Sequence, residues 1–154
     1  MHFEGSESFA DSADRLRDYL GDAGRLARAM PDHVMTLSGR DRAEWDVRPK
    51  FAFMAGSLHT IAEIALRTPD DIRYRIASVG VGSSSTMDVR LSIVAKDDGT
   101  LVRWTGDMVE LGGILKLVPR GMLQVAALKV IADVWIAVRR TLHEEDATSG
   151  AKPG

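Results

Sequence analysis

The stretch Met87–Trp104, MDVRLSIVAKDDGTLVRW, decides the fold. Its apolar side chains recur at every second position on both sides of a central break: Met87, Val89, Leu91 and Ile93, then Val102 and Trp104. A period of two predicts strands with one apolar and one polar face. Asp98-Gly99, inside the break, is a strong signal for a tight hairpin turn. The stretch is therefore predicted to be an antiparallel hairpin with one buried face.

The same alternation extends outward over much of the chain. Further runs predict strands at 3–9, 33–37, 43–47, 58–66 and 72–76, and the run that contains Trp104 continues to Met108. Turn-forming segments such as Thr68-Pro69-Asp70-Asp71 separate them. One wet and one apolar face throughout is typical of an antiparallel sheet covered on a single side. Together the runs predict seven strands.

Three segments have helical patterns. Asp11 or Ser12 can cap a helix over 12–20, and Asp22 a second short helix that Pro31 ends. A long helix is predicted from Pro119 to Leu142; it would measure about 36 Å. Seven strands span about 30 Å, so this helix can cross the whole sheet. The predicted fold class is α+β, a helix-grip (START-like) architecture: a curved seven-stranded antiparallel sheet, two short helices after strand 1, and a long C-terminal helix across the sheet.

The predicted last helix carries a narrow polar stripe. Its members are Lys116, Arg120, Gln124, Lys129, Asp133 and Arg140. We interpret the stripe as the solvent side of a helix whose remaining surface is apolar. Because charges interrupt the apolar stretch Gly112–Val138, the sequence argues against a transmembrane span.

Composition limits the class of protein. The chain has 154 residues, 45% of them hydrophobic and 27% charged, which fits one globular domain. We predict a single domain at 1–144 and a flexible polar tail at 145–154. A formal net charge of −2 gives no electrostatic reason to expect nucleic acid. The absence of cysteine excludes disulfides, thiolate catalysis and cysteine-based metal sites. No signal peptide is recognisable at the N-terminus, so a cytoplasmic location is expected.

Several short segments, taken with the order of the elements, resemble a known family. They are Phe3-Glu4-Gly5-Ser6, Ser12-Ala13-Asp14-Arg15-Leu16, Leu26 to Met30 followed by Pro31, Asp98 to Trp104, and Leu111-Gly112-Gly113-Ile114-Leu115. In these segments the chain resembles the carbon monoxide dehydrogenase G-subunit family, within the START-related (SRPBCC) superfamily of polyketide cyclases and lipid carriers. The likeness covers about residues 2–142, and its motifs are moderately specific.

The resemblance implies a function that composition does not. It implies a cytoplasmic binding protein that accompanies a molybdenum hydroxylase such as carbon monoxide dehydrogenase and holds a quinone-like or lipid-like ligand. It also implies contact with the inner face of the membrane. Some relatives carry a C-terminal membrane-associating segment, whereas this sequence ends in Ala147–Gly154, which leaves direct anchoring in doubt. No cofactor is required on this interpretation, and the expected ligand is an isoprenoid quinone or a lipid.

Large apolar side chains recur on the predicted inner face and on the helix that covers it. A curved sheet and a straight helix leave space between them, and such a space takes apolar ligands. Each of these side chains alone is better explained as core packing, but as a group they favour a cavity. The predicted lining consists of Met30, Trp45, Phe51, Phe53, Met87, Trp104, Met108, Leu115, Met122 and Val125.

Signals for other chemistry are weak. Gly80–Ser85 is glycine-rich but joins two strands and opens no helix, so it is interpreted as a hairpin loop and not a phosphate cradle. His59 and Glu63 lie four apart on a strand, about 13 Å, which is too far to share a metal. The arginines of the outer face are interleaved with Asp88 and Asp107, which favours a solvated face with cross-strand pairs over a basic docking surface.

Three functions remain open. The leading hypothesis is a non-catalytic carrier of a hydrophobic small molecule. The second is a cyclase- or aromatase-type enzyme using the same cavity, for which Thr60 and Tyr74 are the polar residues predicted to face inward. The third is an interaction module in which the apolar last helix forms a homodimer or binds a partner. The sequence leaves the choice between monomer and homodimer open.

Overall fold

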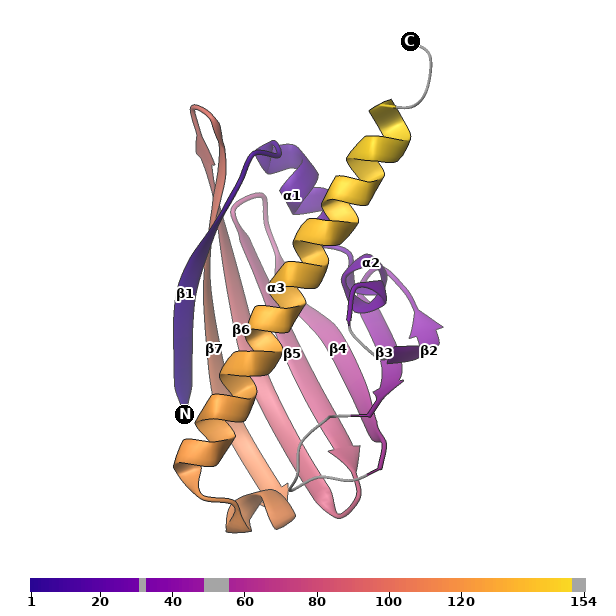
Figure 1. Ribbon diagram of the computed structural model, residues 1–154, viewed down its shortest axis with the longest axis vertical. Helices are drawn as coiled ribbons and strands as arrows, with labels where there is room; N and C mark the ends of the chain where they lie inside the picture. Colours follow the sequence, from indigo (N-terminus) through magenta and orange to yellow (C-terminus); the bar gives the residue numbers. More distant parts are fainter. Residues whose placement is uncertain (31–32, 49–55, 151–154) are drawn as a thin grey trace.

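The computed structural model describes residues 1–30, 33–48 and 56–150, with side chains up to 146. Over these residues the chain forms one antiparallel sheet of seven strands in the order β1-β7-β6-β5-β4-β3-β2 (Figure 1). The strands are β1 His2–Phe9, β2 His33–Ser38, β3 Arg42–Val47, β4 Leu58–Arg67, β5 Asp71–Gly80, β6 Ser83–Lys96 and β7 Gly99–Gly113. Each strand from β2 to β7 pairs with the next along the chain, and β1 closes the far edge on β7.

The hairpin predicted at Asp98-Gly99 is confirmed. Lys96 pairs with Gly99 at the end of the β6–β7 ladder. Gly99 has φ 152°, and a Cβ there would lie 2.0 Å from the carbonyl oxygen of Phe9. Only glycine fits because the end of β1 passes directly over the turn.

The two short helices follow β1, as predicted. They are α1 Ala13–Leu20 and α2 Ala23–Arg28. The Ser12 side chain accepts a hydrogen bond from the Arg15 backbone N–H, and Asp22 does the same for Arg25. Both helices therefore begin at the caps that the sequence offers.

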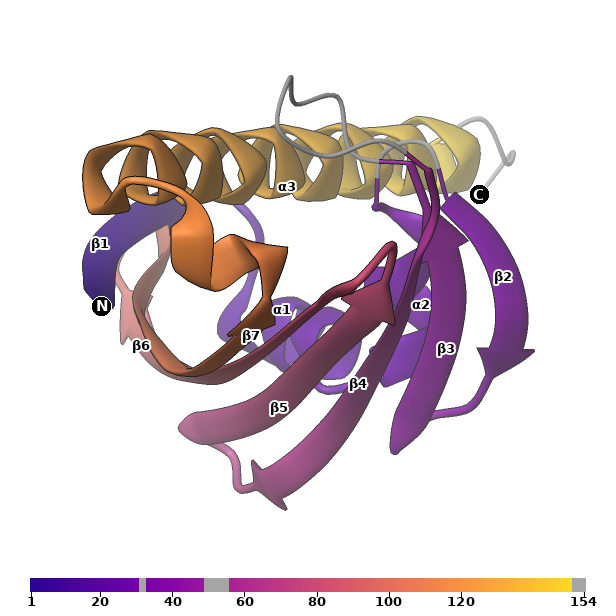
Figure 2. The same cartoon turned by 90° about the horizontal axis from the view of Figure 1, so that it is seen from below.

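The long helix α3, Arg120–Gly150, follows the 3-10 turn η1, Ile114–Leu117. It lies diagonally across the open side of the curved sheet (Figures 1 and 2). The predicted end at Leu142 is too early, and the predicted flexible tail begins inside the helix. Arg25 Nη2 donates to both carboxylate oxygens of Glu145 at 2.9 Å, and Arg15 pairs with Asp146. These ion pairs hold the extra turns against α1 and α2.

The densest packing lies where α1, α2 and the C-terminal half of α3 meet the sheet. The side chains of Leu16, Tyr19 and Leu20 are buried beneath Trp135, Val138 and Leu142. Phe9 of β1 packs against Trp135 with ring centres 6.1 Å apart. This end of the fold is closed by a continuous apolar core.

Candidate functional site

A cavity of about 620 Å³ lies between the concave face of the sheet and α3. Its size falls within the usual range for small-molecule sites, and its lining is predominantly apolar. The sheet curls around one side of this space and α3 spans the other (Figure 2).

Six of the ten predicted lining residues lie on the cavity. They come from three strands, η1 and the segment after α2, and they are Met30, Trp45, Met87, Trp104, Met108 and Leu115. Two more, Phe51 and Phe53, lie outside the described residues. The alternation along the strands therefore selected the inner face of the sheet correctly.

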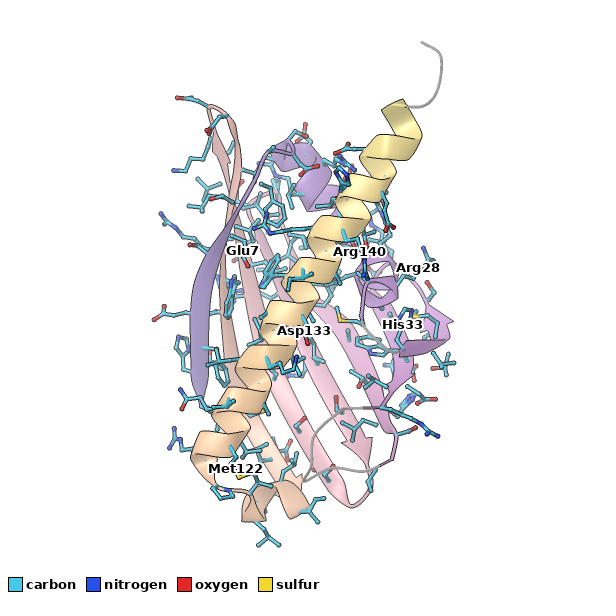
Figure 3. The ribbon with its side chains drawn as sticks, in the orientation of Figure 1. Glu7, Arg28, His33, Met122, Asp133 and Arg140 are labelled. Atoms are coloured by element: carbon cyan, nitrogen blue, oxygen red, sulfur yellow. The ribbon has the colours of Figure 1, made fainter. Side chains whose placement is uncertain are left out.

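Met122 and Val125 do not line the cavity, and their prediction is wrong. Met122 lies in the first turns of α3 (Figure 3) and is exposed, and Val125 is 69% exposed on the outer side of the helix. The inner side instead carries Leu123, Ala126, Ala127, Ile131 and Val134. Because α3 is apolar on nearly every side, its sequence pattern does not fix which side faces the sheet.

Other lining residues were missed. Trp135 lies on the cavity, so all three tryptophans of the chain touch it. Ser78 and Ser85 also lie on it, beside Thr60. Ser78 continues the inward alternation of Tyr74 and Ile76 by one more step, and extending that run would have found it.

Few ionisable groups border the cavity. The Tyr74 hydroxyl donates to the Leu20 carbonyl at 2.5 Å, and burial raises the pKa of Tyr74. Asp133, in the middle of α3 (Figure 3), lies on the cavity lining with Lys129, and Lys129 Nζ donates to Asp133 Oδ2 at 3.1 Å. Within residues 1–30, 33–48 and 56–146, no three His, Asp or Glu side chains are grouped as a metal site would require.

The outer face of the sheet carries paired charges. His59 contacts Asp46 at 2.8 Å and Glu44 at 2.9 Å, and these hydrogen bonds raise the pKa of His59. Arg75 Nε on β5 donates at 2.8 Å to Asp88, which lies directly opposite on β6. This is the solvated face with cross-strand pairs that the sequence favoured.

The outer side of α3 is apolar and exposed. Its exposed side chains include Met122, Val125, Leu128 and Ile136, and Leu117 of η1 is 83% exposed nearby. By length and composition the segment Arg120–Asp146, with a mean hydropathy of 1.7 in its most apolar window, could cross a membrane; 22% of that window is buried. A helix that packs on a core meets the same criterion, and α3 buries Trp135, Val138 and Leu142.

The sequence matches a family described as the G subunit of carbon monoxide dehydrogenase (CoxG) over residues 5–143. A comparison with curated proteins gives no match.

Solved structures share the fold at low sequence identity. A conserved protein from Geobacillus kaustophilus superposes with a TM-score of 0.81 at 18% identity, covering 94% of this chain and 96% of its own. A START superfamily protein from Mycobacterium smegmatis gives a TM-score of 0.70 at 16% identity, with 93% of this chain and 97% of its own covered. The START-like architecture predicted from the strand and helix order is thus confirmed.

Proposed function

The chain belongs to the carbon monoxide dehydrogenase G-subunit (CoxG) family, and from that premise we propose that it is a non-catalytic binding protein that holds a quinone-like or lipid-like ligand in its cavity. The observation that carries this proposal is the mainly apolar cavity of about 620 Å³ between the sheet and α3. Burial of apolar ligand surface is favourable by about 25 cal/mol per Å² before the costs of binding are subtracted.

The groups on the cavity wall support binding more than catalysis. A cyclase or aromatase needs side chains that give and take protons near the ligand. The Tyr74 hydroxyl is engaged by the Leu20 carbonyl, and burial raises its pKa further from neutrality. Lys129 and Asp133 neutralise each other at the edge. The aromatic and methionine side chains, by contrast, suit ligands of variable shape.

The partner belongs to the same proposal. The family description names a subunit of carbon monoxide dehydrogenase. We therefore propose that the chain works beside a molybdenum hydroxylase of that kind, as an accessory protein in the cytoplasm.

Ligand binding is tested by filling the cavity from α3. Ala127 lines the cavity, whereas Val125 of the same helix is exposed, so Ala127→Phe and Val125→Phe add the same ring on opposite sides. Decylubiquinone and a fatty acid are titrated separately, with quenching or change of tryptophan fluorescence as the signal, because Trp45, Trp104 and Trp135 all line the cavity. We expect Ala127→Phe to weaken binding at least tenfold and Val125→Phe to leave it unchanged.

The native ligand is sought by organic extraction and mass spectrometry of protein purified from its own host. If the wild-type chain yields no quinone or lipid and binds neither titrant, the carrier proposal fails. If Val125→Phe weakens binding as much as Ala127→Phe, the ligand does not occupy this cavity.

The outer side of α3 supports a second part of the proposal, namely peripheral contact with an anionic membrane surface. Exposed Leu117, Met122, Val125, Leu128 and Ile136 lie along η1 and one side of α3. Two basic residues, Lys116 and Arg120, lie among these side chains, whereas Lys129 further along is paired with Asp133. Apolar side chains flanked by basic ones match a surface of anionic lipids.

Vesicle flotation tests the membrane contact. The double variant Leu117→Asp/Val125→Asp should lose binding to phosphatidylglycerol vesicles, whereas Val34→Asp, at a 66% exposed site on β2, should retain it. Neutral phosphatidylcholine vesicles should bind the wild type more weakly. Failure of the wild type to float with anionic vesicles would overturn the membrane contact. A dimer in analytical ultracentrifugation that the double variant dissociates would assign the exposed side of α3 to a second copy of the chain.

A further inference from the structure

Three hydroxyl side chains form a row across the floor of the cavity. Thr60 of β4 lies directly opposite Ser78 of β5, and Ser78 lies directly opposite Ser85 of β6. All three line the cavity. Directly opposite residues in an antiparallel pair have Cβ atoms about 5 Å apart, so the three hydroxyls follow one another at about that interval.

The row has more hydrogen-bonding capacity than it uses. Thr60 Oγ1 and Ser78 Oγ lie 3.0 Å apart, and this contact uses one of their two hydroxyl hydrogens. No other side-chain hydrogen bond of Thr60, Ser78 or Ser85 is formed with the part of the chain that the structure describes. Thr60 is only 5% exposed, so bulk water has little access to it. Ser78 and Ser85 are half-buried, so two donors and several lone pairs remain on a mainly apolar cavity wall.

The hydroxyls occupy one level of the cavity only. The same row is flanked by Trp45, opposite Thr60, and by Leu111, opposite Ser85. The next inward-facing row carries Ala62, Ile76, Met87 and Met108 in register across four strands. Beyond it the lining continues with Val89, Leu91 and Trp104. The three hydroxyls thus form a polar band near the η1 end of a wall that is otherwise mainly apolar, with Leu58 and Leu115 on the far side of the band.

We propose that the Thr60–Ser78–Ser85 row is a polar subsite that binds a carbonyl or hydroxyl oxygen of the ligand. This rests on the proposed function and deepens it: the ligand is an amphiphile whose oxygen-bearing head lies at the η1 end and whose hydrocarbon part lies along Met87 and Met108. A ligand that covers these hydroxyls without hydrogen-bonding to them leaves them desolvated and unpaired, so a site of this kind discriminates against an otherwise equal molecule that lacks the oxygen.

Two probes with the same carbon skeleton separate polar from apolar recognition. Menadione, 2-methyl-1,4-naphthoquinone, carries two carbonyl oxygens that 2-methylnaphthalene lacks. Each is titrated into the wild type, into Thr60→Val/Ser78→Ala and into Ser85→Ala. Ser84→Ala is the matched control, because Ser84 is the neighbouring serine on β6 and does not line the cavity. Circular dichroism verifies that each variant is folded.

We expect the double variant to bind menadione about tenfold more weakly and Ser85→Ala about threefold more weakly. Affinity for 2-methylnaphthalene should stay the same or rise, since the substitutions make the wall more apolar. Ser84→Ala should change neither affinity.

The outcomes distinguish this inference from the function on which it rests. If the wild type binds both probes and the substitutions leave the menadione preference unchanged, the row holds only water and the subsite is overturned while the carrier function stands. Equal weakening of both probes would assign the hydroxyls a packing role and would also overturn it. If the wild type binds neither probe nor the larger titrants, both proposals fall together.

Discussion

The two halves of α3 belong to one continuous helix but have different surroundings. The C-terminal half packs on α1, α2 and the sheet, and buries Trp135, Val138 and Leu142. Between Arg120 and Asp133 no side chain is buried, and the inner side of this half lies over the cavity. One helix therefore serves as a core element at one end and as the roof of the cavity at the other.

The comparison separates the half of α3 that stabilises the fold from the half that lies over the cavity. Apolar surface removed from water stabilises the closed end, together with the ion pairs of Arg15 and Arg25 with the end of α3. The open half makes few buried contacts, and regions of that kind open locally at low free-energy cost. On the proposed function, we therefore expect a ligand to enter under the first turns of α3 and to leave the core at the last turns undisturbed.

The comparison is tested by replacing one leucine by alanine in each half of α3, and the largest effect on stability is expected in the closed half. Leu142→Ala removes a side chain that is 1% exposed in the closed end and should lower the free energy of unfolding by about 2–4 kcal/mol. Leu123→Ala faces a space that already exists, so it adds no new enclosed void and should cost about 1 kcal/mol or less. Urea denaturation measures both. Equal losses would mean that the open half is as tightly packed as the closed half.

The sheet and its inner face could be predicted because the alternation of apolar and polar residues along each strand indicates which side chains face inward. From Met87 to Ile93 in β6, and at Val102, Trp104 and Met108 in β7, apolar residues alternate with others, so Met87, Trp104 and Met108 could be assigned to the cavity from the sequence. Ser78 was missed at the end of the same kind of run, because a serine carries no apolar signal. The hydroxyl row exists only through the register of three strands, and register is a tertiary property.

The orientation of α3 could not be predicted because the helix is apolar nearly all round. Val125 and Ala127 both fit an inner side by sequence, and only packing of Trp135 and Val138 at the far end fixes the rotation. The end of the helix was misplaced for a related reason. Glu145 was interpreted as part of a polar tail, whereas its partner, Arg25, lies 120 residues earlier in the chain.

A smaller effect concerns the polar contact that holds the last turns of α3. Arg25 lies with its guanidinium carbon 5.1 Å from the centre of the Tyr19 ring and donates to both oxygens of Glu145. Glu145→Gln keeps a hydrogen-bond acceptor but removes the charge. Because both partners are partly exposed, we expect a loss of about 0.5–1 kcal/mol in the free energy of unfolding.

The matched control for Glu145→Gln is Asp133→Asn, which removes the charge of the Lys129–Asp133 pair in the open half. That pair is more exposed and ties no two elements together, so its loss should change stability by about 0.3 kcal/mol or less. Hydrogen exchange should then report faster exchange in the last turns of α3 for Glu145→Gln, and no change there for Asp133→Asn. If Asp133→Asn has the larger effect on unfolding, α3 is held from its open half, and the division of the helix into an anchored end and a roof is wrong.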